Sequence, residues 1–212
     1  EALRLAAEHH EPLSNAYALT GLGLAYTQVS FWNLDQPSKP FYDNSYKPEL
    51  HWYDRAFVGA AADPWQASLR VGVQHESNGQ DGDDSRSLNN AYAQSTLTWR
   101  IDDRRVLRLT PRVWDYLGDL EDNPRLNETR GHWSCQVAYG WRDDLMASVE
   151  LRPGAGGRYP LFTAEVTYPL HRITGGNVPI FLMAQAVTGY GETLRAYDAY
   201  DSAVRIGIAL VR

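Results

Sequence analysis

The chain reads, from residue 65 to residue 77, Trp65-Gln66-Ala67-Ser68-Leu69-Arg70-Val71-Gly72-Val73-Gln74-His75-Glu76-Ser77. Apolar side chains occupy the odd positions up to Val73, and polar side chains occupy most of the even positions. A period of two residues is typical of a β-strand with one apolar and one polar face. The stretch therefore predicts a long strand, because a tilted membrane-spanning strand needs about 9–11 residues.

The same alternation recurs on both sides of this stretch, and convincing helical periodicity is missing. About eleven strands are expected in all, which predicts an all-β protein built from antiparallel strands. Besides 65–77, the expected strands are residues 1–8, 17–32, 47–60, 89–101, 104–113, 132–141, 144–152, 159–170, 179–189 and 202–212.

The connections between these strands alternate in length. Tight turns are expected at Asp63-Pro64, Asp102-Asp103 and Arg142-Asp143, and longer loops at 33–46, 77–87, 118–130, 153–158 and 190–201. Short turns at one end and long loops at the other are typical of outer-membrane barrels, as are aromatic residues near strand ends. Such aromatic residues are Trp32, Trp52, Tyr53, Trp65, Trp99 and Trp141.

Two soluble folds also alternate in this way, the β-sandwich and the lipid-binding barrel, with the charged face in water. The length of the strands and their aromatic ends favour a transmembrane β-barrel. Eleven is an awkward count, because single-chain bacterial barrels have even numbers of strands. Either one strand precedes Glu1, in a chain that is mature or trimmed, or the count is wrong by one.

Composition narrows the function classes. The 212 residues suffice for one domain over 1–212, and the net charge of −6 without a basic run gives no indication of a nucleic-acid partner. A single cysteine, Cys135, excludes an intrachain disulfide. No run of about 18 apolar residues is present, which excludes a transmembrane helix.

Three polar residues interrupt the apolar faces of two neighbouring strands. His75 and Ser77 continue the face of Val71 and Val73, and Asn89 begins the apolar face of the strand 89–101. A hairpin that joins the two strands brings the three side chains together at its loop end, facing outward. Such a trio supports acyl transfer, with Ser77 as nucleophile, His75 as base and Asn89 orienting the imidazole.

A purely structural interpretation of these residues stays open at this point. A His-x-Ser pair is common on protein surfaces, and Ser and Asn beside loops usually form turns. The acidic run Asp81-Gly82-Asp83-Asp84 is more often a solvated loop than a calcium site, and it does not match the EF-hand spacing.

The run from His75 to Gly79, followed by the run from Ser85 to Asn89, resembles the signature of the outer membrane phospholipase A family of Gram-negative bacteria. Segments outside the signature resemble the family in the same order, so that the resemblance extends from about residue 17 to residue 210. These segments are residues 25–32, 46–50, 122–124 and 189–194.

The resemblance implies a twelve-stranded barrel in the bacterial outer membrane, with its active site at the outer-leaflet side. It implies a calcium-dependent enzyme, active as a homodimer, that hydrolyses acyl esters of phospholipids and lysophospholipids. It assigns the trio the roles given above and matches Gly79 to the oxyanion hole. The implied calcium ligands are Ser85, the backbone carbonyl of Gln80, Ser38 supplied across the dimer interface, and Asp122 at a second site in the monomer.

Two departures from the family pattern accompany the resemblance. The family has a further strand before the point where this chain begins, and the final residues, Leu210-Val211-Arg212, lack a terminal aromatic residue. Trimming at both ends would explain both. Two rival functions remain at this stage: a non-catalytic barrel, such as a porin, and a soluble lipid-binding barrel.

Overall fold

The computed structural model describes residues 20–32, 36–39, 41–59, 63–175 and 180–210. Within them, ten antiparallel strands form one sheet in which each strand pairs with its neighbours in sequence. The strand expected at 1–8 lies outside the described residues. The strands are β1 (Gly21–Trp32), β2 (Phe41–Val58), β3 (Trp65–Ser77), β4 (Ser87–Arg100), β5 (Arg105–Leu117), β6 (Trp133–Trp141), β7 (Met146–Arg152), β8 (Leu161–Pro169), β9 (Phe181–Tyr190) and β10 (Tyr200–Ala209).

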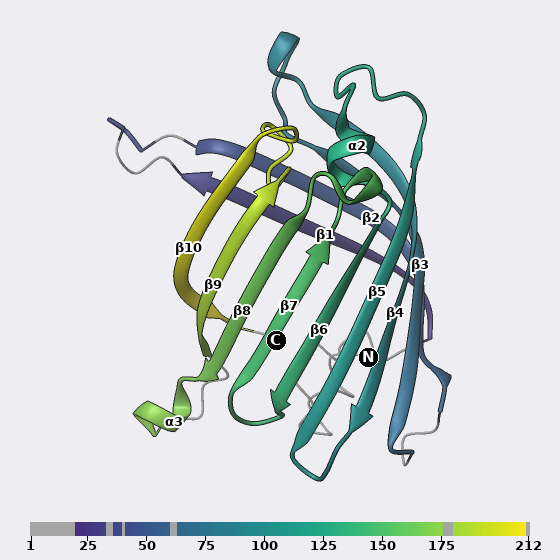
Figure 1. Ribbon diagram of the computed structural model, residues 1–212, viewed down its shortest axis with the longest axis vertical. Helices are drawn as coiled ribbons and strands as arrows, with labels where there is room; N and C mark the ends of the chain where they lie inside the picture. Colours follow the sequence, from purple (N-terminus) through teal and green to yellow (C-terminus); the bar gives the residue numbers. More distant parts are fainter. Residues whose placement is uncertain (1–19, 33–35, 40, 60–62, 176–179, 211–212) are drawn as a thin grey trace.

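The sheet curls round so that β1 and β2 lie behind the central strands (Figure 1). Contacts at the loop end join its two edges. The guanidinium of Arg205 in β10 lies 5.3 Å from the centre of the Phe31 ring in β1. The backbone N–H and the guanidinium of Arg195 donate to Asp43 and to the carbonyl of Tyr42, at 3.2 and 3.0 Å. These contacts give the sheet the form of a barrel.

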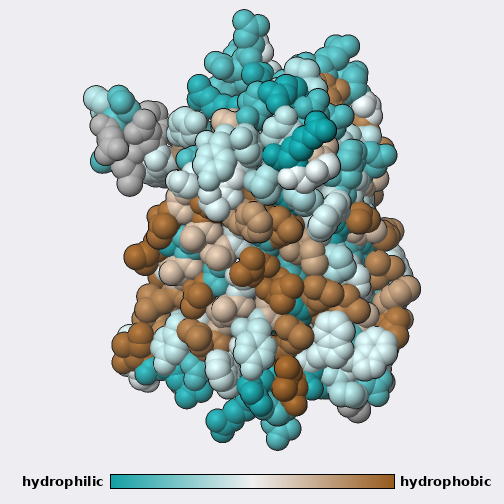
Figure 2. All heavy atoms as spheres, viewed as in Figure 1, coloured by the Kyte–Doolittle hydropathy of each residue, from teal (hydrophilic) through white to brown (hydrophobic). Residues whose placement is uncertain are grey.

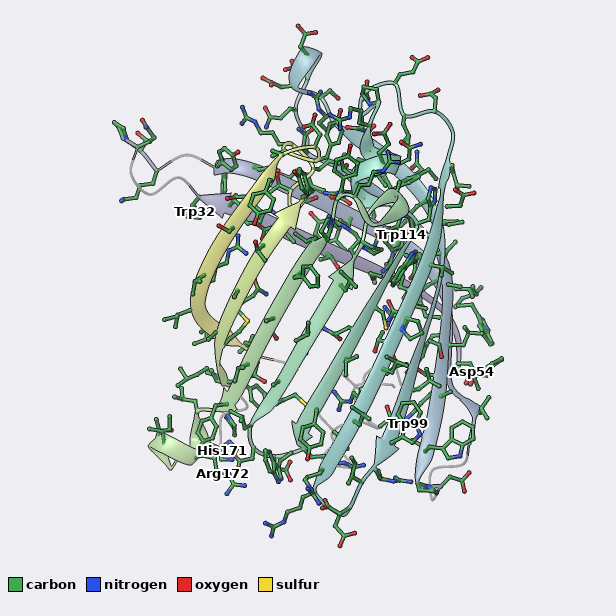
Figure 3. The ribbon with its side chains drawn as sticks, in the orientation of Figure 1. Trp32, Asp54, Trp99, Trp114, His171 and Arg172 are labelled. Carbon is green, nitrogen blue, oxygen red and sulfur yellow. The ribbon has the colours of Figure 1, made fainter. Side chains whose placement is uncertain are left out.

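Burial is the reverse of that in a soluble protein. Leu24 and Ile206 are more than 80% exposed, whereas Glu76 and Asp43 are at most 5% exposed. The apolar side chains form a belt between polar ends (Figure 2). Trp32 and Trp99 lie toward opposite ends of the molecule, as aromatic girdles do (Figure 3). An apolar belt of this extent fits lipid and not water, which is contrary to the soluble alternative.

The interior of the barrel is filled by side chains. An apolar cluster closes it at the loop end, and a second cluster of Val106, Ala138 and Met146 lies toward the turns. Between them, polar residues surround a cavity of about 230 Å³. A filled interior is contrary to a wide porin channel. The loop-end cluster is Leu88, Leu126, Leu194 and Tyr197.

Helical segments are short, and they sit in the connections between strands. No helix among the described residues is long and apolar enough to cross a membrane. The segments are η2 (Gly82–Asp84), α2 (Leu126–Arg130), η3 (Ala155–Gly157) and α3 (His171–Thr174).

The sequence placed most strands within a few residues, and its largest error concerns β2. This strand begins at Phe41 and not at residue 47, so that the expected loop 33–46 is shorter. Asp43 pairs with Phe31, and Tyr46 pairs with Ser77. The pairing continues beyond the apolar belt, where polar side chains can lie on both faces, and the period of two is lost there.

Candidate active site

The hairpin of β3 and β4 sets His75 opposite Asn89. The two strands pair without a register shift from Trp65 and Trp99 to Ser77 and Ser87. Nδ1 of His75 lies 2.9 Å from Oδ1 of Asn89. Because an amide oxygen only accepts hydrogen bonds, this contact requires a proton on Nδ1, and in the neutral imidazole it leaves Nε2 as an acceptor.

Ser77 shares the outward face of β3 with His75. Both side chains are half-buried, and Val73, two residues before His75, is 46% exposed on the same face. In the part of the chain that the structure describes, neither Nε2 of His75 nor Oγ of Ser77 forms a hydrogen bond. Side chains two residues apart on a strand are about 6–7 Å apart at their roots, a gap that an imidazole can bridge.

Gly79 follows the strand in a conformation that only glycine adopts easily. Its φ is +68°, in the left-handed region. A Cβ at this position would lie 2.8 Å from Cε2 of Tyr46, on the neighbouring strand β2. Both observations require glycine at this position, two residues after Ser77.

The catalytic end of β3 is anchored from inside the barrel. Glu76 points inward between the outward-facing His75 and Ser77. Its carboxylate accepts hydrogen bonds from Ser45 in β2 at 2.5 Å and from Arg130 in α2 at 2.9 Å. The ammonium of Lys47 lies 3.4 Å away. Two other elements, β2 and α2, thus converge on one buried carboxylate of β3.

Two of the four expected calcium ligands lie in the loop between β3 and β4. Gln80 stands near its beginning and Ser85 near its end. Within the described residues, the Ser85 hydroxyl and the Gln80 carbonyl form no hydrogen bond. The side chains of Asp81, Asp83 and Asp84 are exposed beside them. Hard oxygen donors in an acidic loop suit calcium chemically.

The other two expected ligands lie on other loops. Asp122 is exposed on the loop after β5, next to Asn123, whose Nδ2 donates to the carbonyl of Ser87 at 2.6 Å. This bond places that loop beside the loop end of the hairpin. Ser38 lies between β1 and β2, in the described segment 36–39, which projects from the rest of the molecule (Figure 1).

The described residues contain no group of three or more His, Cys, Asp or Glu side chains arranged to hold a metal ion.

Four residues that support this site were not predicted from the sequence: Glu76, Asn78, Asn123 and Arg130. Parity indicated that Glu76 faces inward, but Arg130 lies 54 positions away and no local pattern connects the two. Asn78 and Asn123 are at most 1% exposed, although loop asparagines are usually solvated turn formers.

A family model described as Phospholipase A1 matches residues 11–210. The chain belongs to the phospholipase A1 family. A relative from Neisseria meningitidis serogroup B is 32% identical over 194 residues, which cover 88% of this chain and 48% of that protein. The phospholipase A1 of Escherichia coli K12 is 28% identical over 202 residues, which cover 89% and 62%. The chain thus spans about half to three fifths of the curated relatives it matches.

Solved structures agree with this membership. Outer membrane phospholipase A from Escherichia coli matches with a TM-score of 0.74 and 26% identity, over 88% of this chain and 68% of that one. The calcium-bound dimer of the Salmonella typhi outer membrane phospholipase matches with a TM-score of 0.74 and 25% identity, over 88% and 69%. The predicted family, the antiparallel barrel fold and its place in the outer membrane are confirmed.

Proposed function

We propose that this chain carries the catalytic site of a calcium-dependent phospholipase that hydrolyses acyl esters of phospholipids and lysophospholipids. The observation that carries the proposal is the 2.9 Å contact between Nδ1 of His75 and Oδ1 of Asn89, on the outward face and two residues from Ser77. Family membership supports the same reaction class.

In the proposed reaction, Ser77 attacks the ester carbonyl while Nε2 of His75 takes the hydroxyl proton. Asn89 holds the proton on Nδ1 and so keeps Nε2 free to accept. His75 then gives its proton to the leaving alcohol, and the acyl group stays on Ser77. Water, activated by His75, releases the fatty acid and restores the enzyme.

The tetrahedral intermediate carries a negatively charged oxygen. We assign to the backbone N–H of Gly79 the role of donating a hydrogen bond to this oxygen. A donor fixed in such a position is worth about 3–4 kcal/mol of barrier. The left-handed backbone at Gly79 and the Tyr46 ring against it support this role, because they restrict how that peptide can move.

Phospholipid would reach the site without leaving the membrane. Below the trio, the outward face of the hairpin is apolar, with Val71 and Val73 on β3 and Ala91 and Ala93 on β4. Acyl chains that lie along this face bring the ester to the loop-side rim, where Ser77 stands.

Calcium fits the donors around the loop, and we assign its ligands there to Ser85, the Gln80 carbonyl and Ser38 of a second copy. We assign Asp122 to a second calcium site in the monomer. The Ser85 and Gln80 oxygens are not engaged within the described residues. Bound calcium supplies Lewis-acid stabilisation of the developing oxyanion. The segment 36–39, which contains Ser38, projects from the rest of the molecule (Figure 1), and this supports the proposal that Ser38 serves a second copy of the chain in a homodimer.

Serine-directed sulfonylation tests the nucleophile directly. With calcium and detergent present, a sulfonyl fluoride should label Ser77 and abolish hydrolysis, and Ser77→Ala should remain unlabelled. A wild-type protein that hydrolyses phospholipid but is labelled at another residue would refute the assignment. A protein that neither hydrolyses nor reacts would support a non-catalytic barrel.

A further inference from the structure

Asn78 is the first residue after β3 and is only 1% exposed, although it starts a surface loop. Its backbone N–H donates to the carbonyl of Arg86 at 3.0 Å, which closes the base of the loop 78–86. Its side chain therefore lies inside this loop, one residue after Ser77 in the sequence.

The carboxamide of Asn78 binds the loop at three points. Nδ2 donates to the carbonyl of Asp84 at 2.8 Å. Oδ1 accepts from the backbone N–H of Arg86 at 3.0 Å and from that of Gln80 at 3.3 Å. These contacts need a donor and an acceptor on one short side chain, which Asn supplies and Asp or Ala does not.

The three points lie next to the groups that the proposed reaction uses. Gln80, held through its N–H, follows Gly79 and carries the carbonyl assigned to calcium. Asp84 and Arg86 stand on either side of Ser85. The Tyr46 ring lies against Gly79, which stands between Asn78 and Gln80.

We propose that Asn78 is the positioning residue that sets the calcium affinity of this loop and the geometry of its oxyanion donor. The inference rests on the proposed function. Asn78 touches neither substrate nor the reacting atoms; it acts by fixing Gln80 and Ser85. One buried side chain thereby couples the metal ligands to the peptide behind the nucleophile.

Calorimetric titration of calcium chloride into folded, chelator-treated protein in detergent micelles tests the proposal. Asn78→Ala should weaken calcium binding at least about tenfold, in the range found when supports of metal ligands are removed. It should also slow sulfonylation of Ser77 at saturating calcium. Asn90→Ala is the matched control, because Asn90 is buried on the same hairpin and lines the interior cavity instead of the loop.

If folded Asn78→Ala binds calcium within twofold of the wild-type affinity and is sulfonylated at an unchanged rate, the role of Asn78 is overturned. That result would leave the proposed function standing. If Asn78→Ala does not fold, Asn78→Ser serves instead, because it keeps a polar group but cannot bond all three partners. Wild-type affinity in that variant would equally overturn the inference, and weakened affinity supports it. A wild-type protein that binds no calcium contradicts the proposed function itself.

Discussion

Asn89 occupies the place that a carboxylate holds in the Ser-His-Asp triad. Its amide can orient the imidazole of His75, but it carries no charge to stabilise the imidazolium. The contribution of Asn89 should therefore be that of one hydrogen bond, about 1 kcal/mol.

We expect His75→Ala to lower kcat/KM by about 10³-fold, because the general base is lost. Asn89→Ala should lower it by only about fivefold to tenfold, which corresponds to one hydrogen bond. The measurement is hydrolysis of phospholipid in micelles, with folding checked by the heat-sensitive mobility of the barrel on gels. The opposite ranking would contradict the role assigned to Asn89.

At the residue scale, strand parity predicted much of the candidate site. The period of two placed His75, Ser77 and Asn89 on outward faces, and the structure has them there. The sequence did not reveal the interior contacts of Glu76, because its partners come from β2 and α2. Such contacts depend on how the barrel closes, which local periodicity does not encode.

At the scale of elements, the end of β3 depends on the ion pair between Glu76 and Arg130. Both side chains are less than 10% exposed. Glu76→Gln leaves Arg130 buried without its counter-charge, which should cost about 3–5 kcal/mol of unfolding free energy. Urea unfolding in detergent micelles measures this cost.

The matched control for that experiment is Glu128→Gln. Glu128 forms an exposed pair with Arg125 at 3.6 Å, and such pairs contribute about 0–1 kcal/mol. Equal effects of the two substitutions would show that Glu76 does not anchor the strand.

The turn between β4 and β5 should be sensitive to acid. The backbone N–H groups of Arg105 and Arg104, together with the Arg105 guanidinium, donate to Asp102 and lower its pKa to about 2. The folded pKa lies below the unfolded value of about 3.9. The stabilisation is therefore present above about pH 4 and is lost as the pH falls through about 2.

Hydrogen exchange at the amides of Arg104 and Arg105 checks this prediction. After correction for the intrinsic rate, their protection should decline between pH 4 and pH 2 in the wild type. Asp102→Ala should lack that pH dependence. Constant protection in the wild type would be contrary to the expectation.

At the scale of the whole molecule, the alternation of side chains predicted the barrel, and alternation of loop lengths predicted its two ends. The interior was less predictable. Leu88, Leu126 and Leu194 come from three distant segments and pack together under the loops. The start of β2 was also missed, because the period of two is lost outside the apolar belt.

If Ser38 serves the site of a second copy, inactive variants should complement each other. A mixture of Ser38→Ala and Ser77→Ala contains about half mixed dimers, each with one complete site, which predicts about a quarter of wild-type activity. Each variant alone should be inactive or nearly so. Hydrolysis after co-refolding measures the effect, and a mixture no more active than its parts would be contrary to a shared site.

The most direct test of the account is phospholipid hydrolysis in micelles by the wild type and by Ser77→Ala, each with calcium and with chelator. We expect hydrolysis by the wild type with calcium, and in the other three conditions no hydrolysis above the rate of micelles alone. Calcium-dependent hydrolysis by Ser77→Ala at the wild-type rate would contradict it.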